Sequence, residues 1–104
     1  EAYRNDQILS KHKNDLGLFV KYAQKNSTQL IAVVIPFLAD LEMSDAIYVN
    51  DIAGFFEANN VSVVNVSQLA RKIPVPERTV NKNDTHASKK LNGIIAQEIL
   101  NKLK

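Results

Sequence analysis

Residues 29–36 read QLIAVVIP, a nearly unbroken apolar run in which β-branched isoleucine and valine predominate. A run of this kind is typical of a strand that is covered on both faces, as the strands of parallel sheets are. Pro36 ends the strand, because proline has no amide hydrogen to give to a sheet ladder. A second strand of the same kind is predicted at residues 61–66, VSVVNV. Together the two runs predict a parallel sheet at the centre of the fold.

Helical patterns surround both strands. Apolar residues at helical spacing predict helices from about Arg4 to Lys25, from Ser44 to Asn59, from Gln68 to Lys72 and from Ser88 onward. Ser44, Ser67 and Ser88 are expected as N-caps, and Asn59-Asn60 as a left-handed helix end. The core-facing residues are expected to be Leu16, Phe19, Val20 and Ala23 in the first helix and Ala96, Ile99, Leu100 and Leu103 in the last. The alternation of helices and strands predicts a βαβ crossover.

Two strands make a poor sheet by themselves, because three or more with a covered face are normally needed. Both predicted strands resemble central rather than edge strands. The chain begins at Glu1, and its single methionine is Met43. We therefore expect residues 1–104 to form a single α/β segment, the C-terminal part of a larger domain. Its partner is expected to be the N-terminal complement of the same domain or a second copy of the chain. Ile31, Val33 and Ile35 are expected to contact that partner or helices packed with it.

The composition excludes several classes of protein. At 104 residues, 45% of them hydrophobic and 23% charged, the chain is an ordinary globular segment. A formal charge of +2 gives no indication of nucleic acid. There is no cysteine, and the two histidines are far apart in sequence, so no metal site or cofactor is predicted. No apolar run reaches the roughly 18 residues that a membrane span needs.

The residues with catalytic potential lie in Asn83-Asp84-Thr85-His86, at the end of a loop predicted from Pro74 to Asn83. In an extended chain the Asp84 carboxylate can reach the His86 ring, since side chains two apart point the same way. In a turn the neighbour is Asn83 instead. A carboxylate on one ring nitrogen fixes the tautomer and leaves the other nitrogen free to act as a general base.

From residue 61 to the C-terminus the chain resembles the last block of the SGNH hydrolases, the GDSL-type esterases and lipases. That block has a strand, a variable loop, D-x-x-H and a helix of the form H-x-N-x-x-G-h-x-x-h-A. Here the sequence is HASKKLNGIIA, with Ser88 in place of the asparagine and Leu91 in place of the glycine, while Ile95 and Ala96 match. The earlier IAVVIPFLADLE is similar to the preceding strand of the family, so the resemblance extends over about Thr28 to Leu103.

The resemblance implies a three-layer α/β fold, a flavodoxin-like parallel sheet to which this chain supplies the C-terminal strands and helices. It implies ester hydrolysis or acyl transfer on a small ester substrate, without a cofactor. His86 would be the catalytic base, oriented by Asp84 or Asn83. The family spacing places aspartate at the Asn83 position, whereas related members with D-x-H spacing match Asp84. The Gly-Asp-Ser nucleophile block does not occur in these residues, so the catalytic serine is expected upstream of them.

The alternative is a helix-turn-helix DNA-binding protein with its motif in residues 66–80, VSQLARKIPVPERTV. Arg71, Lys72 and Arg78 could then contact phosphates. Pro74 occupies the position of the tight turn, and Pro76 hinders a recognition helix beyond its first turn. A small helical DNA-binding domain also has no place for the strand at residues 30–35. The hydrolase interpretation is therefore preferred.

Overall fold

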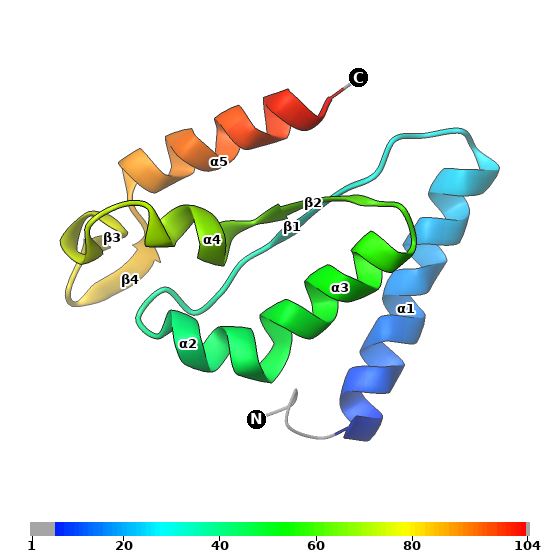
Figure 1. The fold of residues 1–104 in the computed structure, drawn as a ribbon, viewed down its shortest axis with the longest axis horizontal. Coiled ribbons are helices and arrows are strands. Elements are labelled where there is room, and N and C mark those ends of the chain that lie inside the picture. Colours follow the sequence, from blue (N-terminus) through cyan, green and yellow to red (C-terminus); the bar gives the residue numbers. More distant parts are fainter. Residues whose placement is uncertain (1–5, 104) are drawn as a thin grey trace.

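A computed structural model describes residues 6–103 and gives a mixed α/β fold (Figure 1). Two short β-pairs lie among five α-helices, a π-helical turn (η2) and a 3-10 turn (η3). In chain order the elements are α1 (Asp6–Lys25), β1 (Ile31–Val34), α2 (Leu41–Ser44), η2 (Asp45–Val49), α3 (Asn50–Ala58), β2 (Ser62–Asn65), α4 (Val66–Arg71), η3 (Val75–Glu77), β3 (Thr79–Asn81), β4 (Asp84–Ala87) and α5 (Lys89–Lys102). The α/β class predicted from the sequence is confirmed.

β1 and β2 are adjacent parallel strands, as the two apolar runs predict. Ile31 pairs with Ser62 and Val34 with Asn65. The connection between them runs through α2, η2 and α3. A second, antiparallel pair joins β3 to β4, so that the described residues form two separate two-stranded sheets.

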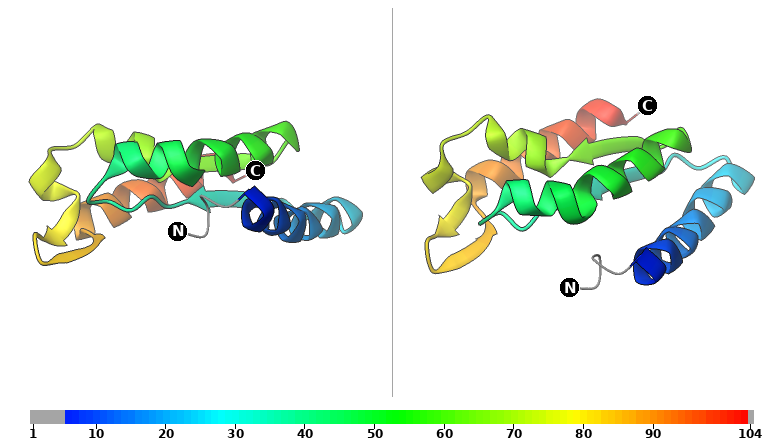
Figure 2. Two further views of the ribbon diagram at one scale, coloured as in Figure 1. Left: turned by 90° about the horizontal axis from the view of Figure 1, so that it is seen from below. Right: turned by 60° about the horizontal axis from the view of Figure 1, so that its bottom comes forward.

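Both faces of the parallel pair are covered, and the strands lie between α3 and α5 (Figures 1 and 2). Ala32 and Val34 face a core of α1 and α3 residues. Ile31 and Val33 lie on the opposite face, against a core of α4 and α5 residues. Alternate residues of one strand therefore pack into two different cores, which explains why the run has no polar positions.

Two of the three predicted serine caps are wrong. Ser44 lies inside the helical segment, because the chain after Pro36 turns early and Asp40 caps α2 by accepting from the Met43 amide at 3.0 Å. The buried Ser44 hydroxyl instead accepts from the Phe37 amide at 2.8 Å and so holds the preceding loop.

Of the predictions for three other helix ends, the cap of α4 is wrong, whereas the cap of α5 and the end of α3 are confirmed. Asn65 rather than Ser67 caps α4, since its side chain accepts from the Gln68 amide at 3.2 Å. Ser88 caps α5 as predicted, accepting from the Leu91 amide at 3.0 Å. After α3, Asn60 is left-handed with φ 61°, as expected for a helix end at Asn59-Asn60.

The buried faces of the first and last helices differ from the predicted stripes. In α1, Val20 and Ala23 are buried as expected, but the Phe19 side chain points outward and is 63% exposed. In α5, the fully buried residue is Leu91, followed by Ile95 and Ile99 one and two turns later. Ala96, Leu100 and Leu103 are exposed. Apolar residues form two stripes at helical spacing along α5, and only the stripe through Leu91 meets the sheet.

Residues 74–83, predicted as a loop, contain η3 and β3, and β3 forms a β-hairpin with β4. Thr79 pairs with Ala87 and Asn81 with Asp84. The Asn81 side chain forms the turn by accepting from the amides of Asn83 and Asp84 at 2.8 and 2.9 Å. Apart from the three-residue 3-10 turn η3, residues 74–81 contain no helix, so the second helix of the helix-turn-helix prediction is absent there.

The buried stripe of α5 can be tested by comparing two leucines of this helix. We expect Leu91→Ala to lower the free energy of unfolding by about 2–5 kcal/mol, since a fully buried leucine leaves a cavity. Leu100→Ala, on the exposed side, should change it by less than about 0.5 kcal/mol. Urea unfolding monitored by circular dichroism measures both. A larger loss for Leu100→Ala would contradict the observed packing of α5.

Candidate catalytic pair on the hairpin

The β3–β4 hairpin carries the predicted catalytic residues Asp84 and His86. Hydrogen bonds and an ion pair connect its base to the neighbouring segments of the chain. The Arg78 side chain donates from Nε to the Ile73 carbonyl at 3.2 Å, where the chain leaves α4. On the other strand, the Ser88 amide donates to the Arg78 carbonyl at 3.0 Å. The Ser88 hydroxyl donates to the Glu77 carbonyl, and Lys90 pairs with the Glu77 carboxylate. These contacts hold the hairpin against the start of α5.

Asp84 and His86 lie two residues apart on β4 and contact each other directly. The Asp84 Oδ1 atom is 2.7 Å from His86 Nδ1 and also accepts from the His86 backbone amide at 3.1 Å. Extended backbone places side chains two apart on the same side, which permits the contact. One carboxylate oxygen thus holds both the ring and the backbone of the same residue.

These hydrogen bonds alter the acidity of the carboxyl. The backbone amide of His86 is the main cause that lowers the pKa of Asp84 below its ordinary value of 3.8, and the hydrogen bond to the ring adds to it. Both bonds favour the ionised carboxylate, because it accepts hydrogen bonds more strongly than the neutral acid does. Asp84 is therefore an anion at neutral pH.

An ionised Asp84 at Nδ1 places the ring proton of neutral His86 on that nitrogen and leaves Nε2 with a lone pair. The His86 side chain is 93% exposed, so Nε2 is accessible to an incoming group. Within residues 6–103 no serine hydroxyl hydrogen-bonds to His86. The pair can orient a base and stabilise its protonated form.

Asn83, the other candidate for orienting His86, lies in the hairpin turn. Its backbone amide donates to Asn81 Oδ1, and its side chain is exposed. Within the described residues no hydrogen bond joins the Asn83 side chain to the His86 ring. The structure thus joins His86 to Asp84 by hydrogen bonds, whereas the Asn83 side chain makes none to the His86 ring.

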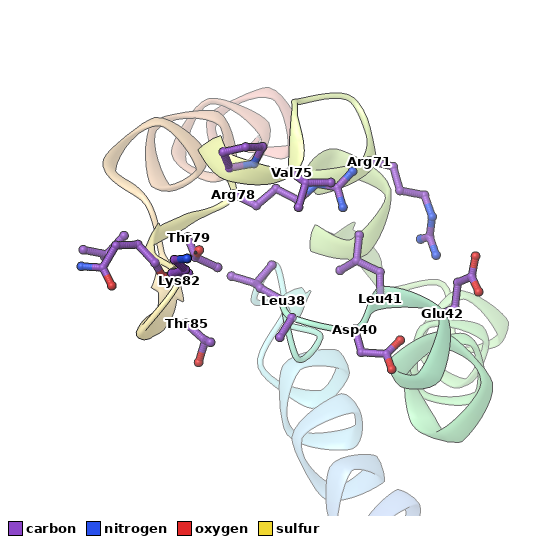
Figure 3. A pocket seen from close by; sticks show the side chains of 14 residues that line it. Leu38, Asp40, Leu41, Glu42, Arg71, Val75, Arg78, Thr79, Lys82 and Thr85 are labelled. Carbon is purple, nitrogen blue, oxygen red and sulfur yellow. Dashed lines mark hydrogen bonds between the residues drawn. The ribbon is translucent and has the colours of Figure 1, made fainter.

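A cavity lies beside the hairpin, and the pair does not line it. It has a volume of about 980 Å³ and lies between the hairpin and the loop from β1 to α2 (Figure 3). Thr85 lines it, whereas Asp84 and His86 do not. Alternation along β4 accounts for this difference, since neighbours of Thr85 point to the other face of the strand.

No sequence pattern predicts this cavity, although two of its lining residues, Arg71 and Arg78, are phosphate contacts in the helix-turn-helix alternative. Within residues 6–103 there is no group of three or more side chains that could hold a metal ion. None of the helices in that range has the length and hydropathy to cross a bilayer.

The Asp84–His86 contact makes a prediction about titration. Because the pKa of Asp84 is depressed, the contribution of the contact to stability is present above pH 3.8 and is lost as the pH falls through the lower folded-state pKa. A carboxyl ¹³C NMR titration should therefore give a midpoint below 3.8 for Asp84.

The His86→Ala variant separates the two causes. It retains the backbone amide, the larger cause, and should keep the greater part of the pKa depression of Asp84. A midpoint that returns fully to 3.8 in this variant would contradict the dominant role of the backbone bond.

Comparison with known proteins provides no further assignment. No family model matches the chain, and no curated protein or solved structure matches it either. The functional interpretation therefore depends on the hairpin geometry and on the motif in residues 84–96.

Proposed function

We propose that residues 1–104 are the C-terminal part of a serine ester hydrolase or acyltransferase of the SGNH type. Its domain would be a three-layer flavodoxin-like sheet to which β1 and β2 belong. The observation that carries the proposal is the 2.7 Å contact between Asp84 Oδ1 and His86 Nδ1, with Nε2 exposed. It provides the base and its orienting carboxylate on one strand, β4.

In this scheme a serine outside residues 1–104 attacks the ester carbonyl. His86 Nε2 takes the hydroxyl proton and then gives it to the leaving alkoxide. Asp84 stays ionised throughout, keeps the ring in the reactive tautomer and stabilises the imidazolium that forms. The depressed pKa of Asp84 suits this role, because the carboxylate must not be neutralised at working pH.

The partner proposed for this chain is the N-terminal complement of the same domain. In the described residues β1 pairs with β2 alone, so its other edge has no strand. Ile35 and Phe37, directly after β1, are 58% and 48% exposed. Such an edge with adjacent apolar side chains favours pairing with another segment. Ile31 and Val33 already pack within this chain, so of the three predicted contact residues only Ile35 stays open.

The test uses the longest gene product that contains these residues, assayed on a small chromogenic ester. We expect His86→Ala to abolish turnover. Asp84→Asn should reduce it on the order of 10³- to 10⁴-fold, because the neutral amide no longer enforces the tautomer. Asn83→Ala serves as the matched control in the same turn and should leave turnover near the wild-type value.

A fluorophosphonate probe identifies the nucleophile in the same protein. We expect the probe to label one serine upstream of residue 1, and we expect this labelling to depend on His86. Label on a serine within residues 1–104, or full turnover in the His86→Ala protein, would contradict the assignment.

A further inference from the structure

The cavity between the hairpin and the loop from β1 to α2 combines fixed cations with an apolar wall. Three cationic side chains line it, Arg71, Arg78 and Lys82. Figure 3 shows Lys82 and Thr85 of the hairpin on one side and Arg71 on the other, with Leu38 and Leu41 between them. The remaining apolar lining comes mainly from η3 and β3, namely Val75, Pro76 and Val80.

Both guanidinium groups are held in place by the protein. Arg71 Nη1 donates to Ser67 Oγ at 2.6 Å and lies 2.7 Å from Asp45 Oδ2. Arg78 is half-buried, and its Nε donates to the Ile73 carbonyl. A guanidinium fixed in this way loses little side-chain entropy when it binds an anion.

The charges of these cations are not equally compensated. Asp45 neutralises Arg71. Among residues 6–103 no carboxylate lies within ion-pair distance of Arg78 or Lys82. Arg78 therefore offers its two terminal nitrogens, and Lys82 adds positive potential at the same cavity.

Two carboxylates on the rim restrict what can bind. Asp40 and Glu42 also line the cavity, and Asp40 is engaged as the cap of α2. They oppose a multiply charged ligand such as a nucleic acid backbone, whereas a single anionic group at Arg78 avoids most of the repulsion. The apolar residues nearby favour a ligand with a hydrocarbon part.

We propose that this cavity binds a small organic carboxylate with an apolar body, the carboxylate at Arg78 and the apolar part against Leu38, Leu41 and Val80. The site is distinct from the Asp84–His86 pair, which points to the other face of β4. It does not depend on the proposed esterase function, because ligand binding can be measured without any catalysis.

The test is a ¹H–¹⁵N NMR titration of the 104-residue chain with hexanoate. We expect saturable shifts confined to the amides of residues 38–42 and 71–85. Acetate, which lacks the apolar body, and hexan-1-ol, which lacks the charge, should each bind more weakly. Equal affinity for hexanoate and either of these probes would overturn the proposal, as would the absence of saturable shifts.

Three variants that each remove one positive charge locate the anion. Arg78→Gln should weaken hexanoate binding about tenfold, since it loses a charge-assisted contact. Lys82→Gln, at the exposed turn and outside the contacts that hold the hairpin, should give a smaller loss that shrinks at high salt. Lys25→Gln, at the far end of α1, is the control and should change nothing. Equal effects of Lys25→Gln and Lys82→Gln would overturn the assignment of the cavity.

Discussion

The parallel pairing of β1 with β2 is the constraint on which the rest of the packing depends. Parallel neighbours cannot be joined by a tight turn, so the chain between them must cross one face of the sheet. α2, η2 and α3 form this crossover, and residues of η2 and α3 bury Ala32 and Val34. The opposite face, with Ile31 and Val33, then has to be covered from the C-terminal side, where α4 and α5 supply Val66 and Leu91. One register therefore determines where the two cores lie.

The hairpin takes its position from these elements and not from a core of its own. The hairpin follows α4 along the chain, and α4 begins directly after β2. The hairpin is followed by α5, whose Leu91 is buried in the second core. Arg78 and Ser88 connect its base to the end of α4 and the start of α5. The Asp84–His86 pair is thus presented on the hairpin, with the His86 side chain largely open to solvent and the Asp84 side chain half-buried. A site of this form suits assembly with another segment that supplies the remaining groups.

The strands and the approximate helices could be predicted from the sequence, because burial on two faces leaves an unbroken apolar run and helical burial leaves a 3.6-residue period. The hairpin could not. Its strands, TVN and DTHA, lack alternating apolar positions, and the Asn81 side chain forms the turn. The α5 face was ambiguous because two apolar stripes run along one helix. Ser44 was the predicted cap of the helix after β1, but the path of the chain after Pro36 starts the helix at Leu41 and makes Asp40 its cap.

The candidate pair was predictable for a local reason, whereas the cavity was not. Side chains two apart on extended backbone meet whatever the tertiary fold, so the spacing predicts Asp84 beside His86 in an extended chain and Asn83 in a turn. The strand Asp84–Ala87 decides for Asp84. The cavity joins residues more than 30 positions apart, such as Leu38 and Val80, and depends on how the hairpin sits against the loop after β1. No local pattern encodes that arrangement.

The central claim is that Asp84 holds His86 as a base with its Nε2 lone pair exposed. It is tested most directly by the ¹⁵N chemical shifts of the His86 ring, measured by long-range ¹H–¹⁵N correlation above the pH at which the ring loses its charge. We expect the proton to reside on Nδ1, and we expect the Asp84→Asn variant to lose this preference. A ring with its proton on Nε2, in the chain with Asp84 intact, would contradict it.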